Sequence, residues 1–354
     1  MKNTPEYIKV YNSLKANIEN KDYSIGKKLP SKRTLCDIYG VSVITVEHAL
    51  ELLKEEGYIE SKERSGNFVI YGKNGYFSSP KTELTLLKNQ YIIKNKDVPF
   101  SLYAKTLRKV ITERSEEIFN KSPNFGLTEL RIAISKYLSR SRGINATYEQ
   151  IIIGSGAEYI YGLVLQVFGN NKKYAIENPS YEKIEKVYKA YGVNFEKLPL
   201  ENNGISKTSL YNCNADVLHI SPYRSYPSGV TASAAKKNEY LHWADNNGKI
   251  LIEDDFESEF SISLKQFDTL FSLSKNDNVI YINTFSKTIA PGIRIGYCVL
   301  PKKMIDIFNE KIGFYSCTVP TFEQYFLTEF INSGDFERHI NRVRRKIRKS
   351  YNEH

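Results

Sequence analysis

The sequence predicts an α/β protein made of two parts. From Leu127 onward, apolar runs of strand length alternate with amphipathic helical segments, which is the pattern of a mainly parallel sheet covered by helices. Residues 1–72 instead carry three helical patterns followed by a hairpin pattern. Residues 73–95 are polar, with Gly, Ser and Pro clustered at the start, which is typical of a linker. We therefore predict domains at 1–72 and 96–354.

Composition places the chain among globular proteins with more than one domain. It has 354 residues, of which 41% are hydrophobic and 25% are charged. No apolar run approaches the roughly 18 residues of a membrane span, and the N-terminus has no signal-peptide pattern. The four cysteines are scattered, which predicts neither a metal site nor a disulfide framework. We expect a cytoplasmic protein without membrane contact.

The net charge of +10 is unevenly distributed. Residues 1–72 hold 11 basic and 10 acidic side chains, whereas residues 338–352 hold 7 basic side chains and no acidic one. Bulk charge therefore does not argue for nucleic-acid binding by the N-terminal part. We interpret the basic C-terminal segment as a solvated helix.

The N-terminal part has well-marked helix boundaries. Residues 5–18 have apolar side chains at helical spacing. Ser31 is expected to cap a helix over 32–39 that stops at Gly40, and Ser42 to cap a third helix that Gly57 ends. Two short strand patterns, at 58–60 and 67–70, flank Ser65-Gly66 as in a β-hairpin. This order is that of a winged helix-turn-helix.

The segment LPSKRTLCDIYGVSVITVEHALELLKEEGYIESKERSGNFV resembles the GntR family pattern LPSxRxLAxxLGVSRxTVxxAYxxLxxEGYLxxxxGSGTFV. The resemblance implies a homodimer that binds double-stranded DNA at promoter repeats. It places Arg33 against the DNA backbone; Ser42, Thr45 and His48 on the recognition helix; and Arg64, Ser65 and Gly66 in the wing. For His48 alone, an ordinary solvated helix position is the preferred explanation. Val43 stands where the family usually has Arg, which predicts weaker phosphate contact.

In the larger part, the expected strands and helices follow the apolar pattern. Strands are predicted at Ile151–Ile153, Tyr174–Ile176, Val217–Ile220, Ile250–Ile252, Val279–Ile282 and Tyr297–Leu300. Helices are predicted at Leu127–Leu138, Tyr181–Tyr191 and Thr231–Asp245.

The stretch Val279–Leu300 suggests a cofactor site. Lys287 lies in a polar turn between two apolar runs, and a buried ammonium is costly unless it is neutralised. An imine with an aldehyde cofactor would remove that charge, and the forked donors of Arg294 could hold a phosphate. An aldehyde and a phosphate on one ring describe pyridoxal 5'-phosphate, PLP. The alternative is a surface loop with an ordinary lysine.

A second stretch, ILIEDDFESEF at 250–260, supports the cofactor interpretation. Its apolar run ends in Glu253-Asp254-Asp255, and carboxylates at the end of a buried strand are expensive unless they meet a cation. The protonated pyridine nitrogen of PLP is such a cation.

Together these stretches resemble the aminotransferase domain of MocR/GabR-type regulators, whose pattern is close to IIEDDYDSEF…VIYxGTFSKxLxPxLRxGY. The resemblance implies a fold-type-I PLP-dependent transferase domain, with Lys287 as the Schiff-base lysine and Asp254 as the partner of the pyridine nitrogen. Within GSGAE, which resembles the phosphate-cradling S-G-x-Q, it assigns Ser155 and Gly156 to the phosphate together with Thr284 and Arg294. The segment NPSY resembles the E-x-P-x-Y turn, whose tyrosine, here Tyr181, stacks on the ring.

The chain departs from that family in three places. Phe256 stands where the family has the tyrosine that bonds the ring hydroxyl, and Arg224 and Ser225 replace His-Gln in SPYRSYPSG. Relatives continue for about another hundred residues beyond the position of His354, so we expect the large domain to be truncated and the small C-terminal domain to be missing.

These features lead to three functional hypotheses. The first is a transcriptional regulator that senses a small amine or amino-acid ligand through an aldimine on Lys287. The second is an aminotransferase with an accessory DNA-binding domain, although the expected truncation makes transaminase activity doubtful. The third is a relic that binds DNA without ligand response.

Overall fold

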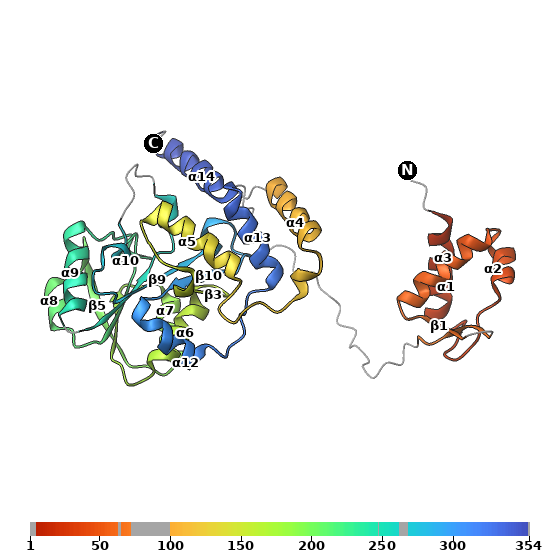
Figure 1. Cartoon of the computed structure of the whole chain (residues 1–354), viewed down its shortest axis with the longest axis horizontal. Coiled ribbons are helices and arrows are strands. Elements are labelled where there is room, and N and C mark those ends of the chain that lie inside the picture. The colour runs from red at the N-terminus through yellow and green to blue at the C-terminus, as the bar shows by residue number, and fades with distance from the viewer. Residues whose placement is uncertain (1–4, 63–64, 72–99, 247, 262–267, 353–354) are drawn as a thin grey trace. The chain divides into compact units, whose positions relative to one another are not determined.

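The computed structural model describes residues 5–62, 65–71, 100–246, 248–261 and 268–352. They belong to two compact units, Met1–Ile92 and Ile93–His354, and each unit is described by itself (Figure 1). The predicted linker at 73–95 and the predicted wing residue Arg64 lie outside the described residues. The exact domain limits of 1–72 and 96–354 stay predictions.

The first unit has the predicted helices and hairpin. Its elements are α1 (Glu6–Glu19), α2 (Lys32–Tyr39), α3 (Val43–Glu55), β1 (Ile59–Lys62) and β2 (Gly66–Val69), with the two strands antiparallel. The Ser31 hydroxyl accepts the Thr34 N–H at 3.1 Å, and the Ser42 hydroxyl accepts the Thr45 N–H at 3.3 Å. Gly40 ends α2 in the left-handed conformation, with φ of 63°. The predicted winged helix-turn-helix is confirmed.

One small hydrophobic core holds this unit together. Every element contributes side chains to it, and the most deeply buried are Leu14, Leu35, Val46, Ala49, Leu53, Ile59 and Val69. A core shared by three helices and a hairpin fixes α3 relative to α2, because neither helix can move without exposing apolar surface.

The second unit is built on one eight-stranded sheet with the order β3-β10-β9-β8-β7-β4-β5-β6. Strands β4, β5, β7, β8 and β9 pair in parallel, whereas β10 and β6 are antiparallel to their neighbours. The strand bounds are β3 Ile151–Gly154, β4 Tyr174–Asn178, β5 Phe195–Glu201, β6 Gly204–Ile205, β7 Val217–Ile220, β8 Ile250–Asp254, β9 Val279–Thr284 and β10 Gly296–Val299. The predicted mainly parallel sheet is confirmed.

Two strands, β5 and β6, are not predicted by the sequence patterns. The β5 sequence FEKLPLE is mostly exposed and mixes charged residues with a proline, so it lacks the continuous apolar run of the other strands. The β6 strand is only two residues long and closes one end of the sheet.

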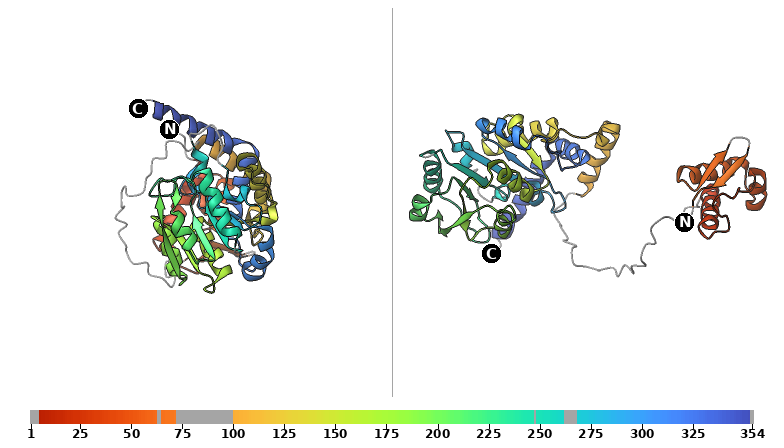
Figure 2. Two further views of the ribbon diagram at one scale, coloured as in Figure 1. Left: turned by 90° about the vertical axis from the view of Figure 1, so that its left-hand side faces the viewer. Right: turned by 90° about the horizontal axis from the view of Figure 1, so that it is seen from below.

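Helices cover both faces of the sheet (Figures 1 and 2). Alternate strand residues such as Ile151 and Tyr281 pack with α5 and α13 on one face, where α9 and α10 also lie, and Ile152 and Ile280 pack with α6, α7 and α12 on the other. The helix bounds are α4 Phe100–Arg114, α5 Thr128–Arg142, α6 Ala157–Phe168, α7 Glu182–Ala190, α8 Lys207–Asn212, α9 Ala234–Asp245, α10 Leu270–Leu273, α11 Phe285–Thr288, α12 Ile305–Ile312, α13 Thr321–Asn332 and α14 Asp335–Asn352. None of the helices in the described part of the chain is long and apolar enough to cross a membrane.

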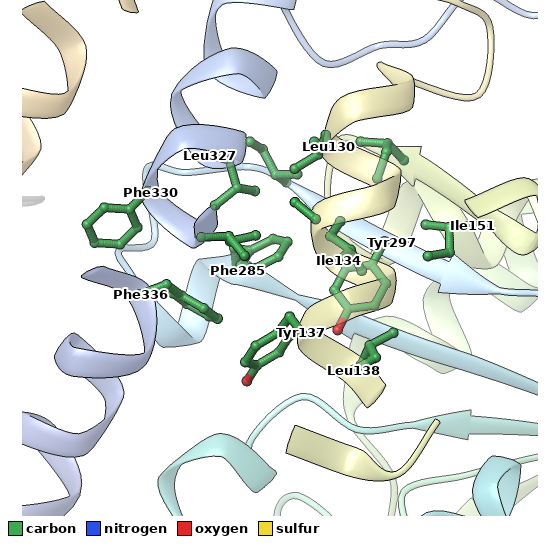
Figure 3. Close-up of a cluster of buried hydrophobic side chains, with 14 of the residues drawn as sticks. Leu130, Ile134, Tyr137, Leu138, Ile151, Phe285, Tyr297, Leu327, Phe330 and Phe336 are labelled. Atoms are coloured by element: carbon green, nitrogen blue, oxygen red, sulfur yellow. The ribbon is translucent and has the colours of Figure 1, made fainter. Parts of the chain in front are cut away.

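An aromatic cluster anchors the short helix α11. Figure 3 shows Phe285, the first residue of α11, among side chains of α5, α13 and α14. Its ring lies 5.5 Å from that of Tyr297 and 5.4 Å from that of Phe336. Phe336 is 1% exposed and also contacts Phe330 and Tyr137. The cluster therefore ties the start of α14 to the helix that carries Lys287.

We predict that Phe336→Ala lowers the unfolding free energy of the second unit by about 3–5 kcal/mol, because it leaves a cavity among packed rings. The matched control is Phe119→Ala, since Phe119 is 85% exposed and its loss should cost less than about 0.5 kcal/mol. The chain has one tryptophan, the buried Trp243 of α9, so its fluorescence in denaturant reports this unit alone. Equal losses in the two variants would contradict the packing argument.

Candidate functional site

The carboxyl ends of β3, β8 and β9 meet at one edge of the sheet. Gly296, at the start of β10, pairs with Gly154 on one side and with Thr284 on the other. This register brings the turn after β3, the helix α11 after β9 and the residues just before β10 to the same place. Ligands of open α/β sheets bind at such an edge.

A cavity of about 420 Å³ lies at this edge. It brings together five of the residues predicted to hold a cofactor, which are Tyr181, Asp254, Thr284, Lys287 and Arg294. Its other lining residues are Ala157, Glu158, Tyr161, Lys183, Tyr226, Phe256, Ser286 and Pro291.

Asp254 is a buried acid that faces the cavity. It is 2% exposed, its Oδ2 accepts a hydrogen bond from the Tyr161 hydroxyl, and His219 Nε2 lies 3.9 Å from the same oxygen. Its Oδ1 has no hydrogen-bond partner among the residues that the structure describes. Burial raises the pKa of Asp254 to about 7, and it lowers the pKa of His219 to about 3, so His219 is neutral. A cationic donor in the cavity would satisfy Oδ1.

The two neighbouring carboxylates have partners inside the protein. Glu253 accepts the backbone N–H groups of Leu270 and Phe271, at 2.9 and 3.0 Å. Asp255 accepts the Tyr281 hydroxyl at 2.8 Å and lies 3.5 Å from Arg142 Nε. Of the three consecutive acids at the end of β8 and just after it, Asp254 is thus the one left for a ligand.

The prediction that Lys287 is buried is wrong. Lys287 is exposed, because α11 begins where β9 ends and its third residue points toward the open cavity and not into the core. Its Nζ lies 5.9 Å from the centre of the Phe256 ring. The cost of burying an ammonium therefore does not explain Lys287, and its place in the cavity is the better argument for a role.

The other end of the cavity is ionic. Arg294 Nη2 lies 2.8 Å from Glu158 Oε2, and Lys183 Nζ lies 2.6 Å from Glu158 Oε1. A Cβ atom on Gly156, which has φ of 96°, would lie 2.8 Å from Arg294 Nη2. Glycine is favoured here by the positive φ, and the lack of a Cβ atom leaves room for the guanidinium beside the start of α6.

Thr284 and Ser155 have bonds that shape their turns. Thr284 is buried; its hydroxyl accepts the Ser286 N–H at 3.2 Å and donates to the Ile295 carbonyl at 3.1 Å. The Ser155 N–H donates to Thr318 Oγ1 at 3.2 Å. Their predicted phosphate contacts stay predictions.

Aromatic rings line the wall of the cavity. Tyr181 is half-buried, and its ring meets that of Tyr226 edge-on, with centroids 6.0 Å apart. The replacements next to Tyr226 point elsewhere: the Ser225 hydroxyl donates to the buried Glu177, and Arg224 Nε lies 3.9 Å from Glu257. Burial raises the pKa of Glu177 to about 8.

The predicted DNA-contact residues that the structure describes lie at the surface of the first unit, and Arg64 is not among the described residues. Arg33 on α2 is exposed, as are Ser65 and Gly66 at the hairpin. The hydroxyls of Ser42 and Thr45 are 2.9 Å apart at the start of α3. His48 on α3 is exposed, and its ring lies 5.4 Å from that of Tyr7.

Comparison with known proteins identifies the family. Residues 6–69 match the bacterial regulatory proteins of the gntR family, and residues 82–353 match aminotransferase class I and II. The HTH-type transcriptional regulator YdeL of Bacillus subtilis is 31% identical over 98% of this chain and 77% of its own length. The chain belongs to the MocR-type family of transcriptional regulators.

A second regulator sequence and a solved aminotransferase structure agree with this assignment. The probable rhizopine catabolism regulatory protein MocR of Rhizobium meliloti is 24% identical over 96% of this chain and 74% of its own length. The crystal structure of Pyrococcus horikoshii kynurenine aminotransferase, in complex with PMP, is 25% identical with a TM-score of 0.65. That match covers 71% of this chain but 64% of the other, so the chain spans less than two thirds of that enzyme.

Three residues at the cavity of this MocR-type chain are not predicted from the sequence as site residues. They are Tyr161, which holds Asp254; Glu158, which joins Arg294 to Lys183; and Tyr226, which packs on Tyr181. Glu158 and Tyr161 are three residues apart on α6 and so share a helix face, which is the one pattern that could have linked them. Their partners lie from 25 to 136 residues away, beyond the reach of any local pattern.

We predict that Asp254→Asn stabilises the ligand-free regulator at pH 8. The folded pKa near 7 exceeds the usual 3.9, so the folded state binds more protons between these values and the unfolding free energy falls as pH rises. The neutral amide removes this loss, which amounts to at most ~1.4 kcal/mol per pH unit. The variant's advantage, measured by denaturation, should reach a few kcal/mol at pH 8 and vanish near pH 4.

The control for this experiment is Asp255→Asn. Because Asp255 is paired with Arg142, removing its charge leaves a buried guanidinium with a weaker partner and should destabilise the unit. If Asp254→Asn destabilises the protein as Asp255→Asn does, Asp254 is an ordinary structural acid.

Proposed function

We propose that this regulator binds promoter repeats as a cytoplasmic homodimer and holds PLP in the cavity of its second unit. A small amine or amino acid reaching Lys287 is then the effector. The observation that supports the cofactor most is that Asp254 lines the cavity while its buried Oδ1 lacks a hydrogen-bond partner within the described residues. An acceptor in that state is expensive unless a ligand donor completes it.

The residues of the cavity fit PLP along its length. Asp254 fits the protonated pyridine nitrogen, Tyr181 offers a ring for stacking, and Arg294 offers a forked donor for the phosphate. When bound, PLP supplies an aldehyde that reacts with amines and a ring that draws electrons. The absence of a hydroxyl on Phe256 leaves the ring oxygen without the partner that the family provides.

The chain's own residues would set the protonation of the site. Tyr161 donates to Asp254 and holds the carboxylate toward the cavity, while the neutral His219 lies behind it. Lys287, exposed at the mouth, has an amine that an incoming ligand amine can replace. This exposure favours a role in sensing, since access to Lys287 is what amine exchange requires.

DNA binding would rest on the exposed start of α3. Ile44 is 72% exposed and Val43 is 46% exposed, which is unusual for large apolar side chains. Beside Thr45 they offer methyl groups of the kind that contact thymine in the major groove. A dimer is proposed because two such helices are needed to read a repeated site.

We predict that PLP forms its covalent adduct on Lys287. Borohydride reduction of the PLP-treated protein, followed by peptide mapping, should give a pyridoxyl group on that residue. Lys287→Ala should lose the adduct, whereas Lys183→Ala should keep it, because Lys183 lines the same cavity but is held by Glu158. An adduct on Lys183, or none on either, contradicts the proposal. Multiple-turnover production of oxo acids would instead favour an aminotransferase.

We predict different DNA-binding defects for two residues of the first unit. Arg33→Ala should weaken binding to all sequences and reduce the salt slope by about 1, as loss of one phosphate contact does. Thr45→Val should relax the sequence preference by about 1–3 kcal/mol at one position. Lys9→Ala, which removes a charge already paired with Glu6, is the control. Mobility-shift titration at several salt concentrations measures all three, and unchanged binding by Arg33→Ala and Thr45→Val rejects the assignment.

A further inference from the structure

Glu158 places a negative charge at the end of the cavity where a phosphate would bind. It is in the first turn of α6, where free N–H groups and the helix dipole favour an anion. Its carboxylate lies between Arg294 Nη2, at 2.8 Å, and Lys183 Nζ, at 2.6 Å. The motif S-G-x-Q, which this turn resembles, has a neutral glutamine at the same position.

This carboxylate is ionised at neutral pH. Burial would raise the pKa of Glu158, but hydrogen bonds from Lys183 and Arg294 outweigh that effect and hold it at about 2. With a side chain 25% exposed, Glu158 is partly shielded from solvent, so its charge is felt within the cavity. Lys183, Arg294 and Glu158 together carry a net charge of +1, compared with +2 if residue 158 were neutral.

The Glu158 carboxylate and a phosphate would both bind to the Arg294 guanidinium. Arg294 Nη2 already bonds Glu158, and Gly156 lets that nitrogen lie against the start of α6, where a phosphate would meet the backbone N–H groups. A phosphate dianion must therefore displace Glu158 from Arg294 or accept a repulsive neighbour. Unphosphorylated pyridoxal meets neither obstacle.

We propose that Glu158 competes with the phosphate group for Arg294, so that the cavity discriminates only weakly between PLP and pyridoxal. The inference rests on the proposed cofactor role of the cavity. Glu158 is then a specificity-determining residue of this chain, and it makes occupancy by PLP follow the free PLP concentration.

The first test compares the affinities of two ligands in two proteins. Glu158→Gln and the unchanged regulator are titrated with PLP and with pyridoxal, and the absorbance of the Lys287 adduct is followed. Glu158→Gln should bind PLP at least tenfold more tightly, with the pyridoxal Kd changed less than twofold. Glu182→Gln, which removes an exposed and already paired carboxylate, should change neither Kd. An equal gain for both ligands, or no gain for PLP, overturns the proposal.

A second test is independent of Lys287. Inorganic phosphate is added at constant ionic strength, and the Tm of the second unit is followed through Trp243 fluorescence. The increase in Tm should be larger for Glu158→Gln than for the unchanged regulator, and the excess should disappear in Glu158→Gln/Arg294→Met. If neither PLP nor pyridoxal forms an adduct, the proposed function fails while this test still decides on Glu158. An equal response to phosphate in both proteins overturns the competition.

Discussion

The pairing of Gly296 with both Gly154 and Thr284 is the constraint on which the site depends. It makes β10 an antiparallel strand between β3 and β9, both of which point their carboxyl ends toward the cavity. The chain entering β10 must therefore pass beside the chain leaving β3 and β9. Arg294 reaches the start of α6 for this reason, and Lys287 stands at the same edge. The aromatic cluster around Phe285 then holds α11 in place through contacts with α5, α13 and α14.

The energetics of Asp254 suggest that its environment serves a ligand. A buried carboxylate with one oxygen left without a partner in the described structure lowers stability above neutral pH, and the protein could relieve this by using an amide. The neighbouring acids show the alternative, since Glu253 and Asp255 are satisfied by backbone N–H groups and by Arg142. A buried carboxylate oxygen with no partner in the described part of the chain, beside two satisfied acids, is the kind of trade-off between stability and function that binding sites often show.

The sequence predicted what depends on neighbouring residues. The caps Ser31 and Ser42, the stop at Gly40 and six of the strands follow from local patterns, and the structure confirms them. The burial of Lys287 was predicted wrongly because apolar runs on both sides do not show that the turn between them faces a cavity. Because side chains alternate along a strand, the sequence predicts that Asp254 points to the opposite face of the sheet from Glu253 and Asp255. It does not show on which of the two faces the cavity lies, because that depends on packing. The ion pair of Glu158 with Arg294 joins residues 136 apart and has no local pattern at all.

The two ends of the cavity contribute unequally to binding. The Asp254 end offers a buried acceptor with no partner among the residues that the structure describes, and a cationic donor there would add both charge attraction and a hydrogen bond. The Arg294 end offers a cation that is already paired, through its Nη2, with Glu158. In our proposal, a ring ligand would be held mainly through its nitrogen and through Lys287, while its phosphate would gain less binding free energy than a free guanidinium would give. An enzyme benefits from a permanently bound cofactor, whereas a regulator needs binding whose extent changes with concentration. In our proposal, the Glu158 carboxylate at the phosphate end weakens PLP binding, so that occupancy of the cavity changes with the PLP concentration and is not permanent.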